Sequence, residues 1–81
     1  TPVKLELSIR AKNLLLEEYP LAEKDLKNVD GKWILDTKVS GMEGVGRFVI
    51  GLASDIKVID SPELNAYIQD FYIKYLNRFI K

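Results

Sequence analysis

Cysteine and histidine are both absent from this chain of 81 residues. Without cysteine the chain can form no disulfide framework and offers no thiolate nucleophile, which is compatible with the reducing cytoplasm, where we expect the protein. Without histidine it lacks the commonest metal ligand and the commonest general base, so its serines have no histidine to activate them. We predict a protein that is not an enzyme and that holds no metal and no cofactor.

An excess of charge of one sign is also missing, because twelve basic residues balance twelve acidic ones. A domain that binds nucleic acid by itself normally has a basic excess, since phosphate contacts supply most of the affinity. No apolar run approaches the roughly 18 residues needed to cross a bilayer. We therefore expect these residues to contact neither DNA nor a membrane directly.

The chain has an ordinary composition for a globular domain, with 47% hydrophobic and 30% charged residues. A chain of this length forms one domain, which we place over residues 1–81. Because the sequence opens with Thr1-Pro2 rather than with methionine, we interpret it as a fragment of a longer protein.

The first residues alternate between apolar and polar side chains. Over residues 3–9 this alternation predicts a half-buried strand with Ile9 on the buried face. Ser8 can then cap a helix that begins near Arg10 and stops at Pro20, because proline disfavours the helical conformation of the residue before it.

Two short signals position the later elements. Asp30-Gly31 predicts a hairpin turn, since both residues tolerate a positive φ. Ser61-Pro62-Glu63 predicts a helix start, with serine as the N-cap and proline in the first turn. The remaining predicted elements are a helical turn followed by a short strand over 27–29, a strand over 32–40, a helix over 43–53, a strand over 56–60 and a last helix from 62 to 81.

The order of these elements predicts an α+β fold. Right-handed connections acting on a strand, helix, strand, strand, helix, strand order give a ferredoxin-like βαββαβ sandwich, with helices on one face of an antiparallel sheet. The last helix is then an additional C-terminal element that packs elsewhere.

Residues 40–48, "SGMEGVGRF", place three glycines after a predicted strand and before a predicted helix. If the stretch were a phosphate loop, Gly41, Gly44 and Gly46 would bring backbone N–H groups close to an anion, and Arg47 would add a charge. The spacing matches neither the dinucleotide fingerprint nor the P-loop, and Glu43 would repel a phosphate.

A conformational role explains the same glycines. Gly41 would permit a positive φ at the end of the strand, while Gly44 and Gly46 would let the helix lie close to the sheet. Arg47 is then either a solvated surface residue or part of a pocket that recognises a carboxylate or phosphate. Both interpretations are open at this point.

Three carboxylates follow closely in the sequence, at Asp55, Asp60 and Glu63. They could be imagined as an acid-base pair. We expect them instead to end a helix, to end a strand and to interact favourably with the dipole of the last helix.

The last helix contains five of the eight aromatic residues of the chain. Its apolar stripe covers about half of the circumference, which is wider than the usual minimum of about 100°. Part of this stripe can pack on the domain itself, and the surplus predicts an interface with a second copy or a neighbouring domain. The residues that we assign to this interface are Phe71, Tyr72, Tyr75 and Phe79.

Residues 47–52, "RFVIGL", and 56–64, "IKVIDSPEL", resemble the C-terminal extension of bacterial WYL-domain transcription regulators, which reads "RFVLGLG" and "VEVLEPPEL" at these places. The opening residues 3–20 are similar to the strand and helix that begin that extension. The resemblance covers nearly the whole chain as a pattern of apolar positions and turns, without a catalytic signature.

This resemblance implies a role within a larger protein. Such regulators combine an N-terminal helix-turn-helix, a small barrel that carries the Trp-Tyr-Leu motif and senses a ligand, and a ferredoxin-like extension associated with dimer formation. Trp33 has no Tyr-Leu after it, so this chain is not the barrel. DNA binding would then belong to an N-terminal domain outside this sequence.

We therefore expect a regulatory and oligomerisation domain that couples ligand sensing to DNA binding in its parent protein. Its partners would be a second copy or the sensor and DNA-binding domains. The alternative is a small-ligand-sensing ferredoxin-like module, with the Gly41–Arg47 loop in its pocket.

Overall fold

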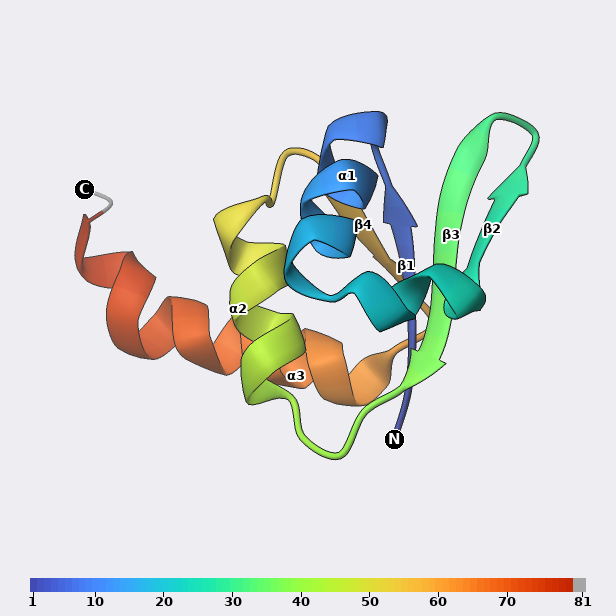
Figure 1. The fold of residues 1–81 in the computed structure, drawn as a ribbon. Helices are drawn as coiled ribbons and strands as arrows, with labels where there is room; N and C mark the ends of the chain where they lie inside the picture. The colour runs from blue at the N-terminus through green and yellow to red at the C-terminus, as the bar shows by residue number, and fades with distance from the viewer. Residues whose placement is uncertain (80–81) are drawn as a thin grey trace.

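The computed structural model describes residues 1–79 (Figure 1). Strands and helices follow one another in the order that the sequence predicts, and the helical turn predicted before the second strand is the short helix η1. η1 and η3 are 3-10 helices, and η2 is a π-helical segment. The elements are β1 (Pro2–Leu7), α1 (Ile9–Glu18), η1 (Pro20–Asp25), β2 (Leu26–Val29), β3 (Lys32–Lys38), α2 (Glu43–Gly51), β4 (Ile56–Ile59), α3 (Pro62–Phe71), η2 (Tyr72–Leu76) and η3 (Asn77–Phe79).

The four strands form one antiparallel sheet in the order β2-β3-β1-β4. β1 lies between β3 and β4, so that Leu5 is opposite Leu35 on one side and Val58 on the other. The architecture is therefore α+β, with a sheet and helices compatible with the ferredoxin-like fold that we predict.

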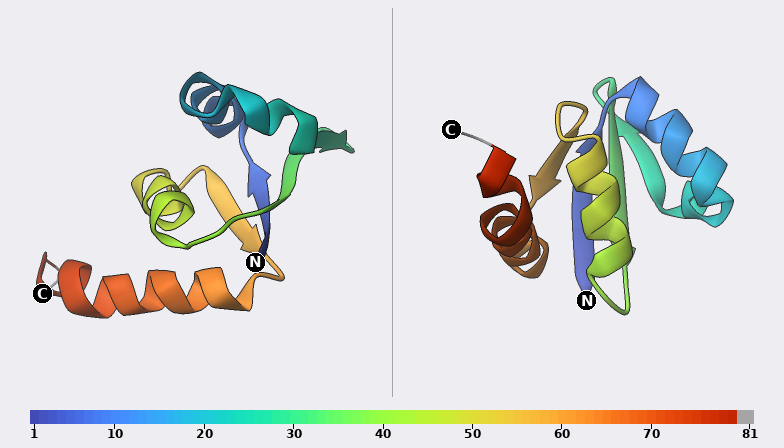
Figure 2. Two further views of the ribbon diagram at one scale, coloured as in Figure 1. Left: turned by 60° about the horizontal axis from the view of Figure 1, so that its bottom comes forward. Right: turned by 90° about the vertical axis from the view of Figure 1, so that its left-hand side faces the viewer.

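The alternation along β1 separates the two faces of the sheet. Val3, Leu5 and Leu7 are at most 3% exposed and belong to the core that α1 and α2 help to form. These two helices cover one face of the sheet (Figure 2). No helix of residues 1–79 covers the opposite face. The buried core consists of Val3, Leu5, Leu7, Ala11, Leu15, Leu35, Val49 and Leu64.

Ser8 ends the first strand earlier than the alternation predicts. Its hydroxyl oxygen accepts a hydrogen bond from the backbone N–H of Ala11 at 3.0 Å, which confirms its predicted role as the cap of α1. The helix consequently begins at Ile9, whose side chain is 66% exposed. The prediction that Ile9 belongs to the buried face of the strand is wrong, because the cap turns the chain before that residue.

The predicted hairpin turn joins β2 to β3. Asp30 and Gly31 have φ values of 52° and 82°, the positive values that a type I′ turn requires at both central positions. The side-chain oxygen of Asn28 accepts a hydrogen bond from the N–H of Gly31. The two-residue signal in the sequence was therefore sufficient to locate this turn.

Ser61 occupies the N-cap position of α3, as predicted, but its side chain does not cap the helix. The hydroxyl accepts a hydrogen bond from the backbone N–H of Lys4 at 2.9 Å and donates one to the carbonyl of Ile59 at 2.8 Å. Ser61 is only 2% exposed, and Asp60 before it has a positive φ of 41°. The serine thus joins the start of α3 to β1 and β4.

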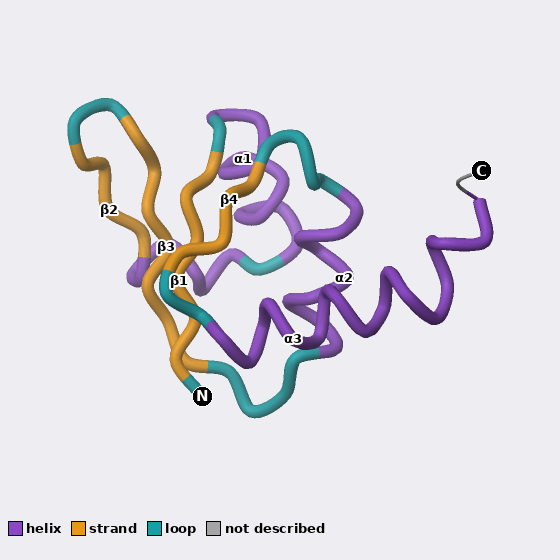
Figure 3. The backbone as a smooth tube through the Cα atoms, turned by 180° about the vertical axis from the view of Figure 1, so that it is seen from behind, coloured by secondary structure: helices purple, strands orange, loops and turns teal. Residues whose placement is uncertain are grey.

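The last helix leaves the body of the domain. Helical structure continues through α3, η2 and η3 as one segment, which runs past α2 and away from the sheet (Figures 2 and 3). Its hydrogen bonds change from the α to the π pattern over Tyr72–Leu76. The predicted end of this helix at residue 81 lies outside the described residues.

We predict that Ser61→Ala lowers the free energy of unfolding by about 1–3 kcal/mol, because the N–H of Lys4 loses its acceptor in a partly buried site. Urea denaturation measures this change. The matched control is Ser54→Ala, where the only side-chain hydrogen bond is exposed and 3.4 Å long, and which should change stability by less than about 0.5 kcal/mol. Equal effects of the two substitutions would contradict the role given to Ser61.

Candidate functional site

The glycine stretch is divided between a connection and the first turn of a helix. α2 begins at Glu43, so Gly44 and Gly46 lie within the helix and Gly41 lies in the connection before it. Among the described glycines, Gly31 has a positive φ, whereas Gly41 does not. The prediction of a positive φ at Gly41 is wrong, because the connection enters the helix through Met42 in the right-handed helical conformation.

Arg47 makes an ion pair within its own helix. Its guanidinium lies 3.3 Å from the carboxylate of Glu43, one turn earlier, and both side chains are largely exposed. The positive end of the α2 dipole is therefore already next to a carboxylate. These contacts are those of an exposed helix surface.

Two hollows flank α2, and the four predicted ligand residues divide between them. Gly41 and Gly44 line a groove of about 620 Å³ between α2 and the α1–η1 segment. Arg47 and Gly44 line a neighbouring hollow of about 580 Å³, while Gly46 lines neither. The structure therefore does not gather the four residues around one site.

The larger of these hollows is an apolar groove. Leu15 and Leu35 contribute to its lining, and Tyr19 and Phe48 meet edge to face across it with ring centroids 6.4 Å apart. Its volume lies within the usual range of small-molecule pockets, about 300–1,000 Å³. Its lining and volume suit a small apolar ligand.

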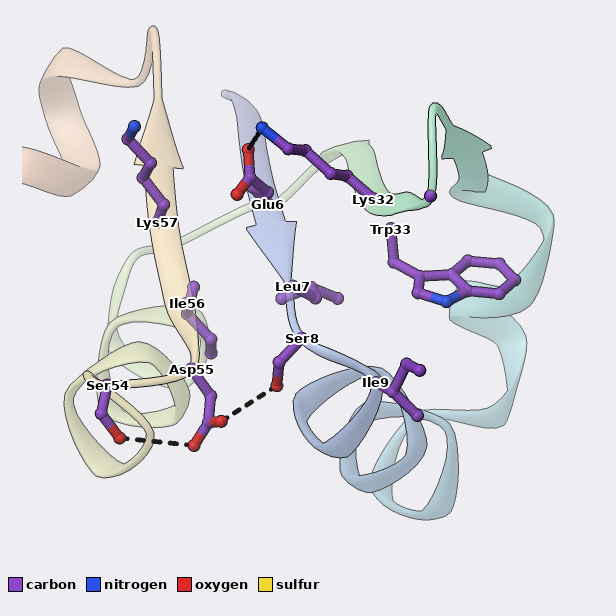
Figure 4. Close-up of a pocket in the computed structure, with 11 residues that line it drawn as sticks. Glu6, Leu7, Ser8, Ile9, Lys32, Trp33, Ser54, Asp55, Ile56 and Lys57 are labelled. Carbon is purple, nitrogen blue, oxygen red and sulfur yellow. Dashed lines mark hydrogen bonds and ion pairs between the residues drawn. The ribbon is translucent and has the colours of Figure 1, made fainter.

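A third hollow, of about 370 Å³, lies at one end of the sheet (Figure 4). Its charged groups contact one another: Lys32 lies 3.8 Å from Glu6, and the carboxylate of Asp55 accepts a hydrogen bond from the hydroxyl of Ser8 at 3.0 Å. Arg10 lies 3.9 Å from Asp55. The carboxylate of Asp55 thus joins the end of the α2 connection to the start of α1.

The three carboxylates that are close in sequence do not converge. Asp55 is bound to Ser8, Asp60 occupies the positive-φ position before α3, and Glu63 accepts a 3.4 Å hydrogen bond from the hydroxyl of Thr1. Within residues 1–79 no group of three acidic side chains is placed to hold a metal ion. No helix in the same range is both long and apolar enough to cross a membrane.

The uncovered sheet face concentrates positive charge, which the neutral composition conceals. The strand register places five lysines and two carboxylates on this face, an excess of three positive charges. These lysines are Lys4, Lys27, Lys32, Lys38 and Lys57, and the carboxylates are Glu6 and Asp36. The charge count of the sequence could not show this segregation, because it depends on which residues share a face.

The start of the last helix is anchored in the body. Leu64 is fully buried in the core, and one turn later the ring of Tyr67 lies directly against Gly46 of α2. A Cβ atom at position 46 would overlap this ring, so Gly46 serves the contact between α2 and α3. The predicted close approach at Gly46 is therefore to another helix rather than to the sheet.

Beyond this contact the aromatic side chains continue along the helix as a ladder. The rings of Tyr67 and Phe71 lie 6.3 Å apart, and those of Phe71 and Tyr75 lie 4.9 Å apart. Exposure increases outward, because Phe71 is half-buried whereas Tyr75 is 47% and Phe79 is 73% exposed. We call residues 71–79 the C-terminal arm.

The other flank of the arm is also exposed. Tyr72 is 41% exposed, and Ile73, which the sequence analysis did not assign to the interface, is 67% exposed. The stripe calculated at 100° per residue does not include Ile73. The π-helical hydrogen bonds of this segment alter that spacing, and a regular pattern in the sequence could not reveal them.

Comparisons with models of protein families, with curated proteins and with solved structures found no match to this chain.

We predict that Gly46→Ala lowers the free energy of unfolding by about 1–3 kcal/mol, because the added methyl group displaces the Tyr67 ring. This loss exceeds the helix-propensity gain of about 1 kcal/mol for replacing glycine with alanine. Thermal and urea unfolding measure the net change.

Gly44→Ala in the same helix is the matched control. A Cβ there would lie 3.9 Å from the hydroxyl of Tyr19, an ordinary contact, so this variant should be neutral or more stable. In a Tyr67→Ala background, Gly46→Ala should also become neutral or stabilising. A loss of stability that persists without the ring would contradict the proposed overlap.

Proposed function

We propose that the chain is a non-enzymatic interaction domain that uses its C-terminal arm to pack against a protein partner. The observation that carries this proposal is the aromatic ladder, which begins under α2 at Tyr67 and reaches solvent at Tyr75, with the exposed ring of Phe79 four residues further along the chain. A contiguous exposed apolar surface of this kind is typical of a contact site.

The chemistry of the arm suits a protein surface. Tyrosine buries an apolar ring while its hydroxyl stays hydrated, and aromatic residues are enriched at the centres of interfaces. Burying a large apolar side chain that is otherwise exposed contributes about 1.5–3 kcal/mol. Within the arm, the side chains with most to gain from such burial are Tyr75, Phe79 and Ile73.

We further propose that this domain is the C-terminal extension of a WYL-type transcription regulator, where it acts in the cytoplasm. Support comes from the similarity of residues 47–52 and 56–64 to that extension, and from a strand order compatible with a ferredoxin-like topology. On this proposal the arm contacts a second copy or the sensor barrel of the parent protein. It couples ligand sensing to DNA binding by an N-terminal domain.

Sequencing the gene upstream of the codon for Thr1 tests the assignment to a transcription regulator. We expect a helix-turn-helix followed by a small barrel with the Trp-Tyr-Leu motif. An unrelated domain in that position would overturn the assignment, while the interaction role of the arm would still be tested separately.

Small-ligand sensing is a second candidate function, which the apolar groove beside α2 favours. Gly41 and Gly44 line this groove. Because Arg47 points to Glu43 instead, a ligand there would be recognised by its apolar surface more than by a charge.

Substitutions in the arm test the interaction role directly. We predict that Tyr75→Ser and Phe79→Ser each weaken association at least tenfold, since each removes at least about 1.5 kcal/mol of apolar burial. Sedimentation measures the association of the chain with itself and with the remaining domains of its parent.

The matched control is Ile9→Ser, which removes a similarly exposed apolar side chain, 66% exposed, from the start of α1. Association should be unchanged in this variant. The proposal is wrong if neither form of association occurs, or if the arm variants associate as the control does.

A further inference from the structure

We propose that the partner of the arm is the arm of a second copy, packed antiparallel with Tyr75 near the two-fold axis. This inference rests on the proposed function of the arm as an interface and names its occupant. It follows from two features of the arm, the order of its aromatic side chains and the order of its charges.

The three rings of the arm form a sequence that is the same when the direction of the helix is reversed. Phe71, Tyr75 and Phe79 follow one another at intervals of four residues, with Tyr75 in the middle. An antiparallel arrangement about Tyr75 places Phe71 against Phe79 of the second copy, and Phe79 against Phe71. The most exposed ring of one arm thereby covers the half-buried ring of the other.

A charged stripe accompanies the ladder, because Asp70, Lys74 and Arg78 each directly precede one of its rings. The carboxylate of Asp70 lies 3.0 Å from the ammonium group of Lys74, and the guanidinium of Arg78 lies 5.4 Å from the ring of Phe79. In the isolated arm the N-terminal end of the stripe is therefore acidic and the C-terminal end is basic.

The order of these charges selects the antiparallel arrangement. In an antiparallel helix pair the same flank of both helices meets in opposite directions, so Asp70 lies opposite Arg78 of the second copy at both ends of the contact. A parallel pair would instead bring this charged flank against the opposite flank of the second copy, where Tyr72 lies, so Asp70 and Arg78 would gain no partner of opposite charge.

Lys74 lies near the two-fold axis in this arrangement. Its hydrogen bond to Asp70 and the negative charge of that residue raise the pKa of Lys74 above its ordinary value. The carboxylate of Asp70 thus lies beside each Lys74 where the two Lys74 side chains approach each other, and it offsets the repulsion between their ammonium groups.

The arms give a small interface. Two to three helical turns bury less than the roughly 1,200 Å² that is typical of stable complexes, so the dimer is expected to be weak and to dissociate in the micromolar to millimolar range. Weak self-association suits a module that is held at high local concentration within a larger protein.

Charge reversal tests the arrangement. Sedimentation equilibrium of the chain from about 10 µM to about 1 mM should show a monomer–dimer equilibrium. Asp70→Lys and Arg78→Glu should each weaken it about tenfold, because either change makes both end contacts repulsive. The double variant Asp70→Lys/Arg78→Glu should restore self-association to within about threefold of the original chain, since opposite charges again face each other.

A mixture of the two single variants gives a second readout. Lysine at position 70 of one chain faces glutamate at position 78 of the other, and the native Arg78 and Asp70 face each other at the opposite end. The mixture should therefore form a heterodimer at concentrations where each single variant alone is monomeric. Lys27→Glu, on the distant strand β2, is the matched charge-reversal control and should leave the equilibrium unchanged.

Three results would overturn the inference: a strict monomer at the highest concentration, a dimer insensitive to both reversals, or a double variant as weak as the single ones. Circular dichroism and unfolding of each variant establish that its fold is retained. If the chain is monomeric but Tyr75→Ser and Phe79→Ser still prevent binding to the remaining domains of the parent, the arm is an interface and only the antiparallel dimer is wrong. If neither association depends on these rings, the proposed function fails as well.

Discussion

The hydroxyl of Ser61 fixes the direction in which the last helix leaves the sheet. It is bonded to the backbone of Lys4 in β1 and of Ile59 in β4, so the start of α3 is joined to two neighbouring strands at once. Asp60 adopts a positive φ immediately before it. A serine at this place therefore serves the sheet, and α3 begins without a side-chain cap of its own.

From this fixed start the helix packs on the body through its first turns. Leu64 enters the core, and Tyr67 rests on the bare backbone of Gly46. Because the helix runs past α2 rather than along it, the next rings of the ladder extend beyond the body (Figure 2). The same geometry that completes the core thus exposes Tyr75 and Phe79.

Local patterns in the sequence were sufficient for the features that depend on neighbouring residues. The cap at Ser8 and the turn at Asp30-Gly31 each involve residues within three positions, and alternation located the strands. The roles of Ser61 and Gly46 could not be predicted in the same way. Ser61 bonds to a residue 57 positions away, and Gly46 contacts a ring that only the packing of two helices brings near. For the candidate site, the sequence was sufficient to predict that the last helix has more apolar side chains than its own domain can bury. It could not predict which of them are exposed, because that depends on how far the helix extends beyond α2.

The size of the domain explains why this surplus is left uncovered. A chain of about 80 residues buries only about 60% of its unfolded surface, and here one layer of helices on one sheet face already encloses the core. Folding the arm back would require an apolar surface that α2 does not offer, because its outer side carries the exposed Arg47–Glu43 pair. On the proposed function, the exposed rings of the arm are buried by a surface from outside the fold. A surface with the same ladder and the reversed order of charges is available on every other copy of the chain.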